Sequence, residues 1–440
     1  MRRRNEIVHG FSKKTRDEKL ELVTSFHENS EEALSIFKSF HHLDGETQKL
    51  IEEFSENTIT SFPLPYSICP NMLINGKAYM VPMVVEESSV VAAAANSAKF
   101  WFDKGGFKTE VLGTEKIGQV HFLWTDDKDK LLSKFSELKE RLIADTSEIT
   151  ENMVKRGGGI MDIELKDLSD LEPGLMQLYA TFETGDSMGA TFINSCLEQF
   201  ASSFKAWHSE QADFKEDGLE VLMSILSNFT PNCKVRCTLE TTIDQLDGAV
   251  KGMTGKEFAR RFRLGVRVAE VDPNRATTHN KGIMNGVDSV VLATGNDFRA
   301  VEACSHTYAS HTGRYTSLSH CEIDGDIFRF YLEIPFALGV VGGLTNLHPL
   351  VKLSLELLDY PSAEELMGIA AAIGLANNYS AVKNLVTVGI QQGHMKMHLL
   401  NILKQLGVPE VHKDFVVNHF KDKVVSVSSV RNLAEKNGFI

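Results

Sequence analysis

Polar and charged side chains are concentrated in one stretch, DPNRATTHNKGIMNGVDSVVLATGNDFRAVEA, which runs from Asp272 to Ala303. It combines arginine, histidine, lysine and aspartate side chains with three glycines. Such side chains do not build an apolar core, whereas catalytic and binding groups are often held by loops on a rigid strand or helix. We therefore predict a functional site here, in which Lys281 and Asp297 carry the charges that chemistry would need.

The pattern between Lys281 and Asp297 predicts a short strand, Val290–Ala293, followed by a helix with regular hydrophobic spacing. Asp297 would then lie in the first helical turn, where the helix dipole favours a carboxylate. Considered alone, Asp297 is more simply explained as a capping residue and Lys281 as a solvated surface lysine. We expect a site nevertheless, because His279–Gly282 and Thr294–Asp297 flank the same short strand.

Two adjacent glutamates, Glu86 and Glu87, follow an apolar strand-like segment and precede an Ala-rich helix. The helix dipole should lower the pKa of a carboxyl group at this position. A general acid needs a raised pKa, which burial beside a second carboxylate such as Asp297 could supply, while Lys281 would moderate it. The residues alone leave both glutamates as candidate acids.

Two segments could bind a dinucleotide, although the sequence has no G-x-G-x-x-G fingerprint. Residues Thr184–Thr191 open a predicted helix, whose free N–H groups would attract a pyrophosphate. An ordinary helix capped by Asp186 explains the same pattern. Gly157–Gly159 lead to Asp162, which could bind a ribose 2′-hydroxyl, and the basic pair before these glycines could bind a 2′-phosphate.

The composition limits the class of protein. The chain has 440 residues and a net charge of −13, which argues against a general nucleic-acid or anionic-membrane binder. No apolar run approaches the roughly 18 residues of a membrane span, and the basic start MRRRNE lacks the apolar stretch of a secretory signal. We therefore expect a cytoplasmic protein of two or three domains.

Metal binding is not expected. The six cysteines are scattered without a C-x-x-C pair, which favours free buried thiols in a reducing compartment. His394 and His398 are four residues apart and could face one metal ion. No carboxylate or cysteine completes a ligand set near them, so we predict no metal site.

Several motifs together resemble the class II, soluble prokaryotic branch of the 3-hydroxy-3-methylglutaryl-CoA (HMG-CoA) reductases. The resemblance covers roughly residues 8 to 400, with the motifs in the order that the family shows. These motifs are ENTITSFPLPYSI (56–68), VEESSVVAAA (85–94), GDSMGA (185–190), HNKGIMNG (279–286), ATGNDFRAVEA (293–303), VGGLTNLHP (341–349) and QQGHMKMH (391–398).

The resemblance implies an α+β fold with three parts. A large α/β domain that binds HMG-CoA would comprise residues 1–113 and 223–380. A ferredoxin-like domain that binds NAD(P), residues 114–222, would be inserted into it, and residues 381–440 would form a small helical flap domain. The resemblance also implies a homodimer, or a higher even oligomer, with the active site at the dimer interface.

The resemblance also assigns roles to individual residues, and the family pattern favours Glu87 over Glu86 as the acid. Ser88 and Thr191 depart from the family's usual proline and asparagine. The implied catalytic residues are Glu87, Lys281, Asp297 and His394; the implied substrate contacts are Ser89, Arg275, Asn228 and Asn285; and the cofactor contacts are Asp186, Met188, Gly189 and Asp162.

The implied reaction is the four-electron reduction of HMG-CoA to mevalonate and free coenzyme A, with two hydrides from NADPH or NADH, NADPH being slightly favoured. Lys281 would stabilise the hemithioacetal oxyanion. A protonated His394 would quench the coenzyme A thiolate, and Glu87 would protonate the alcohol product. Asp297 would join Lys281 and Glu87 in one network, so that their titrations are coupled.

Two alternatives stay open. The same residues could oxidise mevalonate to HMG-CoA in a catabolic direction. Alternatively, a protein of a different class, a catalytically inactive acyl-CoA- or nucleotide-binding protein, could share the fold. The four catalytic residues together argue against the inactive protein, because a pure binder needs no proton donors at both ends of the reaction.

Overall fold

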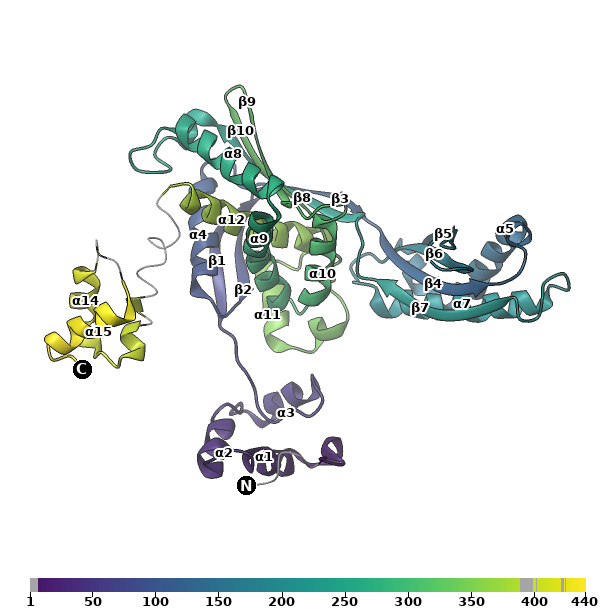
Figure 1. Cartoon of the computed structure of the whole chain (residues 1–440), viewed down its shortest axis with the longest axis horizontal. Coiled ribbons are helices and arrows are strands. Elements are labelled where there is room, and N and C mark those ends of the chain that lie inside the picture. The colour runs from purple at the N-terminus through teal and green to yellow at the C-terminus, as the bar shows by residue number, and fades with distance from the viewer. Residues whose placement is uncertain (1–6, 388–398, 401, 421–422, 424) are drawn as a thin grey trace. The chain divides into compact units, whose positions relative to one another are not determined.

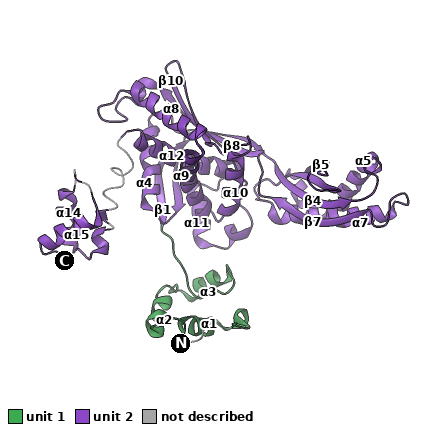
Figure 2. Cartoon of the chain, in the orientation of Figure 1, with its two compact units in different colours: residues 1–65 green, residues 66–440 purple. Residues whose placement is uncertain are grey.

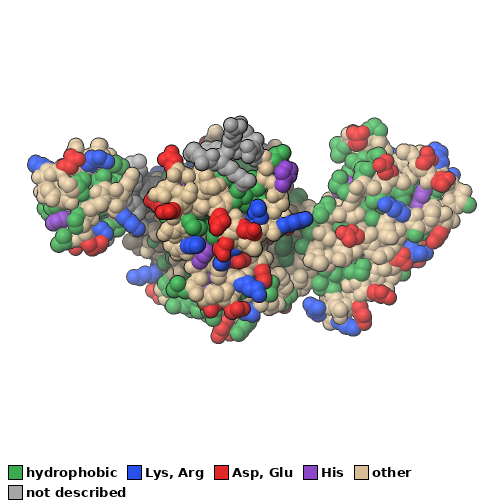
Figure 3. All heavy atoms as spheres, turned by 90° about the horizontal axis from the view of Figure 1, so that it is seen from below, with side chains coloured by type: hydrophobic (Ala, Val, Ile, Leu, Met, Phe, Trp, Pro, Cys, Tyr) green, Lys and Arg blue, Asp and Glu red, His purple; other side chains and the backbone are tan. Residues whose placement is uncertain are grey.

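The computed structural model describes residues 7–387, 399–400, 402–420, 423 and 425–440. The chain divides into two compact units, Met1–Pro65 and Tyr66–Ile440 (Figure 2). On the face seen in Figure 3, acidic and basic side chains are interspersed rather than gathered into a basic patch. No helix within the described ranges is long and apolar enough to cross a membrane.

The first unit is helical (Figure 1). Among its described residues, each of three α-helices begins after a side chain that accepts a hydrogen bond from a first-turn N–H group: Thr15, Asn29 and Asp44. Such capping satisfies backbone donors that have no partner within the helix. The helices are α1 (Arg16–Thr24), α2 (Ser30–Ser39) and α3 (Gly45–Glu53).

The second unit starts with a hairpin of β1 (Tyr66–Ile74) and β2 (Lys77–Val84). Asn75 and Gly76 form its two-residue turn with φ angles of 49° and 83°, the left-handed backbone that such turns require. Helix α4 (Ser88–Phe102) follows and packs on β1. This packing holds the residues at the start of α4 against the body of the unit.

A four-stranded antiparallel sheet has the order β3-β8-β10-β9. Its central strands alternate between buried and partly exposed residues, as expected when one face covers a core. Helices α8 (Gly255–Val271) and α12 (Ala363–Leu385) pack against this sheet. The strands are β3 (Lys108–Thr114), β8 (Cys233–Thr242), β9 (Ser319–Asp324) and β10 (Ile327–Pro335).

A second antiparallel sheet has the order β5-β6-β4-β7 and lies between β3 and β8 in the sequence. Its strands and helices share a separate hydrophobic core that includes Phe122, Phe182 and Phe204. The elements are β4 (Lys116–Trp124), α5 (Lys128–Asp145), α6 (Ser147–Val154), β5 (Gly159–Asp167), β6 (Leu175–Glu183), α7 (Ala190–Glu210) and β7 (Leu219–Ser227).

Helix α9 (Pro273–Ala293) replaces the strand that we predicted at Val290–Ala293. Asp272 caps the helix by accepting from the N–H of Asn274, and Pro273 occupies the first helical position. A short apolar run fits a strand or the buried end of a helix equally well. Here it continues the buried face of α9, so the prediction was wrong.

Helix α12 (Ala363–Leu385) is buried over nearly its whole length and packs on α4, α9 and β8. Glycines allow the close approach of α9, because a Cβ atom at Gly286 would lie 2.7 Å from the Ile373 carbonyl oxygen. Further α-helices in the described ranges include α10 (Phe298–Ala309), α11 (Pro349–Leu357), α14 (Glu410–His419) and α15 (Val427–Lys436).

Candidate active site

Helices α4, α9 and α12 line a cavity with a volume of about 680 Å³. This size is typical of sites for small molecules and cofactors. We call it the three-helix cavity. Four of the predicted residues line it: Glu87, Ser89, Lys281 and Asn285.

The elements explain how these side chains meet. Glu87 is the N-cap of α4, and the hydroxyl of Ser89 donates a hydrogen bond to its carboxylate. Lys281 and Asn285 are one helical turn apart on α9 and therefore share a face. Glu87, and not Glu86, is among the residues that line the cavity.

Three further lysines line the same cavity, and sequence reasoning missed all of them: Lys99, Lys104 and Lys383. The ammonium groups of Lys104 and Lys383 lie 4.3 and 5.2 Å from the centre of the Phe100 ring. Burial lowers the pKa of Lys383. The lining is thus rich in cations, which suits an anionic ligand.

The opposite face of α9 is structural. His279 is buried, and its Nε2 lies 2.6 Å from the hydroxyl of Ser319, which donates to Asn378. The side-chain amide of Asn280 donates to the Thr316 carbonyl oxygen over 2.8 Å. Burial lowers the pKa of His279 to about 3, so the imidazole is neutral at pH 7.

Asp297 does not line the three-helix cavity, as its place in the fold explains. It is the N-cap of α10, and its carboxylate accepts from the N–H groups of Arg299 and Ala300 at 3.0 and 3.3 Å. A helix rises 1.5 Å per residue, so Lys281 and the end of α9 at Ala293 are separated by about 18 Å. Asp297 thus follows the end of α9 that lies away from Lys281, and its network with Lys281 and Glu87 stays a prediction.

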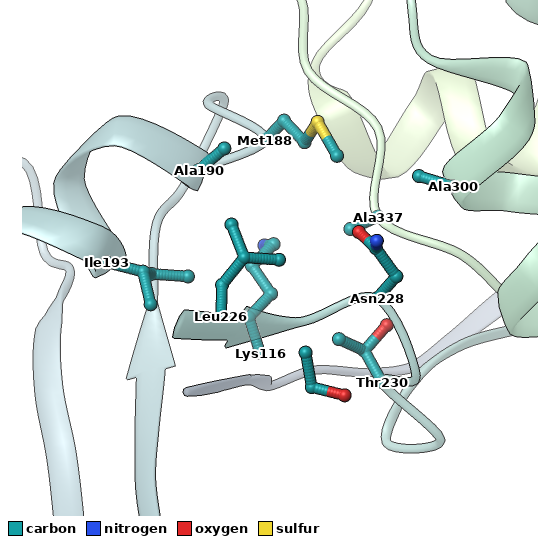
Figure 4. Close-up of a pocket in the computed structure, with 10 residues that line it drawn as sticks. Lys116, Met188, Ala190, Ile193, Leu226, Asn228, Thr230, Ala300 and Ala337 are labelled. Atoms are coloured by element: carbon teal, nitrogen blue, oxygen red, sulfur yellow. The ribbon is translucent and has the colours of Figure 1, made fainter. Parts of the chain in front are cut away.

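A second, much smaller cavity lies where β4, the start of α7 and the start of α10 meet; it holds about 20 Å³ (Figure 4). We call it the junction cavity. Two predicted residues line it, Asn228 and Met188. Ala300 also lines it, and its N–H group donates to the Asp297 carboxylate, which places Asp297 next to this cavity.

The two predicted dinucleotide segments are neighbours. Gly159 pairs with Glu183 at the end of β6, and a Cβ atom at Gly158 would lie 2.5 Å from the Glu183 carbonyl oxygen. Gly189 adopts the left-handed conformation, with a φ of 90°, and is the N-cap of α7. No side chain caps this helix end, so its first N–H groups are available to an anion.

Asp186 does not cap α7, contrary to the simpler explanation of its motif. Its carboxylate accepts from the N–H group of Ala363 at the start of α12, over 2.8 Å. Its carbonyl oxygen accepts from the N–H group of Val340 over 2.9 Å. A Cβ atom at Gly339 would lie 2.5 Å from the Met188 nitrogen. These hydrogen bonds and this close contact hold the loop before α7 against the rest of the second unit.

Neither cavity is lined by Asp162 or Arg275. Asp162 is exposed on β5 and forms an ion pair with Lys139, whose hydrogen bond lowers the pKa of Asp162. Burial lowers the pKa of Arg275 near the start of α9, and the structure gives it no ion pair within the described ranges. His394, like His398, lies outside the described residues.

Asp288 of α9 and Glu302 of α10 form a carboxyl pair that no sequence pattern predicted. Burial and a hydrogen bond with Glu302 raise the pKa of Asp288 to about 8. The hydrogen bond from His306 lowers the pKa of Glu302, and the charge of Lys281 adds to this effect. In the described part of the chain, no three histidine, cysteine or acidic residues are close enough to hold a metal ion.

Most of the chain is similar to known reductases of one family. The family model for hydroxymethylglutaryl-coenzyme A reductase matches residues 15–399. A 3-hydroxy-3-methylglutaryl-coenzyme A reductase of Archaeoglobus fulgidus is 36% identical over 418 residues, which are 93% of this chain and 89% of the relative. A probable reductase of Borreliella burgdorferi is 32% identical over 426 residues, 96% of this chain and 91% of that protein.

Solved structures show the same similarity. A Streptococcus pneumoniae 3-hydroxy-3-methylglutaryl-coenzyme A reductase aligns over 98% of this chain and 99% of its own, with a TM-score of 0.70 and 34% identity. A class II reductase of that organism, described as bound to NADPH in open conformations, aligns over 86% of this chain and 99% of its own. Its TM-score is 0.70 and its identity 35%.

Proposed function

Because this chain belongs to the hydroxymethylglutaryl-coenzyme A reductase family, and to its class II branch, we propose that it reduces HMG-CoA to mevalonate and free coenzyme A. Two molecules of NADPH or NADH would supply the hydrides. A thioester carbon needs four electrons to become a primary alcohol, hence two hydride transfers. NADPH is slightly favoured as the cofactor.

The observation that carries this proposal is that Glu87 and Lys281 face one cavity of about 680 Å³. The first hydride converts the thioester carbonyl into an oxyanion, which the Lys281 ammonium stabilises. Collapse of this intermediate expels the coenzyme A thiolate, which His394 protonates. The second hydride reduces the aldehyde while Glu87, held by Ser89, donates the proton.

The charge of the cavity supports coenzyme A as part of the substrate. Lys99, Lys104 and Lys383 line it beside Lys281, and cations of this density attract phosphate groups. Arg275 is suited to the free carboxylate of the glutaryl group, since a guanidinium can bind both oxygens of a carboxylate. Asn285 lies one turn from Lys281 and would contact the same acyl group.

A second subunit would complete the site. Asp297 lies at the far end of α9, and Gly295 beside it packs against Leu344 and Val351. Exposed apolar side chains surround this region, of a kind that marks protein interfaces. We propose that a second copy covers them and brings Asp297 of the partner subunit to Lys281, in a homodimer or a higher even oligomer. These side chains are Leu344, Leu347, Leu350, Leu353 and Leu357.

The proposal includes the domain assignment. Residues 1–113 and 223–380 would bind HMG-CoA, residues 114–222 the dinucleotide, and residues 381–440 would form the flap. The loop of Asp186, Met188 and Gly189 would meet the cofactor pyrophosphate, and Asp162 its ribose. We place the enzyme in the cytoplasm, where its free thiols stay reduced.

The test is the near-ultraviolet absorbance of reduced nicotinamide when the protein is mixed with HMG-CoA and either cofactor. The wild type should oxidise two cofactor molecules for each thioester. Lys281→Ala should lose this activity by about 100-fold or more, as for the loss of an oxyanion donor. Lys256→Ala, an exposed lysine on α8, is the matched control and should keep it.

Other outcomes would favour the alternatives. Formation of reduced nicotinamide from mevalonate and coenzyme A at a much higher rate than the reverse reaction would favour the catabolic direction. Tight binding of HMG-CoA without turnover by either cofactor would reject the enzyme and favour the inactive binding protein.

A further inference from the structure

The junction cavity contains a buried lysine to which no role has been assigned. Lys116 begins β4 with only 4% of its surface exposed. Its ammonium group donates to the Thr114 carbonyl oxygen over 3.2 Å, and within the described ranges it forms no ion pair. A buried ammonium group is costly unless an anion or several acceptors compensate it.

The adjacent carboxylate is already engaged. Glu183 lies on the neighbouring strand β6, and its oxygens accept from the hydroxyl of Thr114 and from the N–H groups of Thr184 and Gly185. Two of the three protons on the Lys116 ammonium group therefore have no acceptor among the described residues. The positive charge is available to a ligand.

The N-terminus of α7 provides an independent sign of an anion. Ala190 is the first residue of this 21-residue helix and lines the junction cavity together with Lys116. Figure 4 shows the Lys116 side chain extending between the start of α7 and Asn228. The uncapped N–H groups of the helix and its dipole favour a negative charge at the same place.

The size of the cavity limits what can enter. A space of about 20 Å³ admits a group the size of one water molecule and no aromatic ring. Beside a buried ammonium group, a single anionic oxygen that projects from a larger ligand fits this space. In a nicotinamide dinucleotide, the phosphoryl oxygens of the pyrophosphate meet this description.

We propose that Lys116 binds a phosphoryl oxygen of the cofactor's pyrophosphate at the N-terminus of α7. The inference rests on the proposed function in taking the ligand to be a nicotinamide dinucleotide. Lys116 then acts in cofactor binding rather than at the reacting atoms. Its partner is the diphosphate, which NADPH and NADH share, so the residue does not select between them.

The test uses ADP-ribose, which contains the pyrophosphate and lacks the nicotinamide. Lys116→Met keeps the length of the side chain and removes its charge. Calorimetry on the full-length chain should show ADP-ribose and NADPH binding about 10- to 100-fold more weakly, as expected for the loss of a hydrogen bond to a charged group. HMG-CoA binding and kcat at saturating cofactor should stay at the wild-type value.

Lys128→Met is the control for net charge, because Lys128 lies on α5 of the same segment and pairs with Asp167 at the surface. It should bind ADP-ribose like the wild type. If Lys116→Met does not fold, Lys116→Gln takes its place, since the amide can still donate to the Thr114 carbonyl oxygen. The same loss of ADP-ribose affinity is expected.

Unchanged ADP-ribose affinity in a folded, neutral Lys116 variant would overturn the inference, as would a wild type that does not bind ADP-ribose. If Lys116→Met weakened HMG-CoA binding as much as ADP-ribose binding, the role of Lys116 would be structural and the inference would also be overturned. A wild type that binds ADP-ribose through Lys116 but does not reduce HMG-CoA would leave this inference standing and reject the proposed function.

Discussion

The three-helix cavity and the junction cavity differ in size, polarity and exposure of their charges. The first holds about 680 Å³ and presents the exposed Lys281 among other lysines. The second holds about 20 Å³ around the buried Lys116. One chain thus has a large space lined by several lysines and a small space beside a single buried lysine.

The predicted site residues are divided between the two cavities. Glu87 and Lys281 belong to the larger cavity, whereas Asp297 and Asn228 belong to the neighbourhood of the smaller one. The helix between them is rigid and about 18 Å long from Lys281 onward. Because Asp297 follows the end of α9 that lies away from Lys281, the comparison predicts that Asp297 of a partner subunit reaches Lys281 and that catalysis needs two chains.

The strongest test mixes two inactive variants. Lys281→Ala and Asp297→Ala subunits, joined in hybrid dimers and purified through two different tags, contain one intact site and one doubly defective site. Each parent dimer should be at least about 100-fold impaired. The hybrid should recover about half of the wild-type rate, since one of the two symmetry-related sites is whole. A hybrid as inactive as its parents would show that both residues serve the same chain's site.

A glycine replacement should disturb only the smaller cavity. In Gly339→Ala, the new Cβ atom would lie 2.5 Å from the Met188 nitrogen, a backbone atom that cannot give way cheaply. Overpacking of this kind costs about 1–3 kcal/mol. We expect a lower thermal unfolding midpoint and weaker NADPH binding, with unchanged HMG-CoA binding measured by calorimetry.

The matched control for this prediction is Gly45→Ala, where no atom lies within 4 Å of the new Cβ. It should unfold at the wild-type temperature or slightly above. If Gly339→Ala weakened HMG-CoA binding as much as NADPH binding, the two cavities would not be independent.

Substitutions of two asparagines should affect the KM values of the two ligands differently. Asn285 lines the larger cavity and Asn228 the smaller. Asn285→Ala should raise KM for HMG-CoA about 3- to 10-fold, the effect of one neutral hydrogen bond, with KM for the cofactor unchanged. The resemblance made Asn228 a substrate contact, but it lines the cavity that we assign to the cofactor, so Asn228→Ala should show the reverse pattern. Steady-state kinetics with each substrate varied in turn would detect it, and equal effects on both constants would contradict the separation.

The smallest expected effect concerns the face of α9 that points away from Lys281. The pKa of His279 is about 3 in the folded protein and about 6.5 when exposed to water. Between these values the unfolded chain binds more protons, so acidification below about pH 6.5 destabilises the fold by at most about 1.4 kcal/mol per pH unit. His279→Gln should remove this contribution.

Thermal unfolding midpoints measured between pH 7 and pH 5 would test this prediction. The wild-type midpoint should fall more steeply than that of His279→Gln. Parallel curves would show that His279 does not govern this acid sensitivity.

Part of the fold could be predicted from local patterns. Asn75 and Gly76 are a hairpin turn because few residues tolerate positive φ, and the glycine-rich start of α7 carries the same kind of local information. The mixed helix and sheet class was also correct. The strand predicted at Val290–Ala293 failed because a four-residue apolar run has no periodicity that separates a strand from a helix.

The sequence by itself determined the chemical groups, their order and the family to which the chain belongs. Only the tertiary structure decided which groups meet. It brought Glu87 to Lys281 across nearly two hundred residues, because α4 and α9 both pack on α12. It placed Lys281 about 18 Å from the end of α9 at Ala293, because a helix rises 1.5 Å per residue, and it made Asp297 the N-cap of the next helix. It also buried Lys116 at a junction between segments, where the surroundings of a single lysine depend on contacts that no local pattern contains.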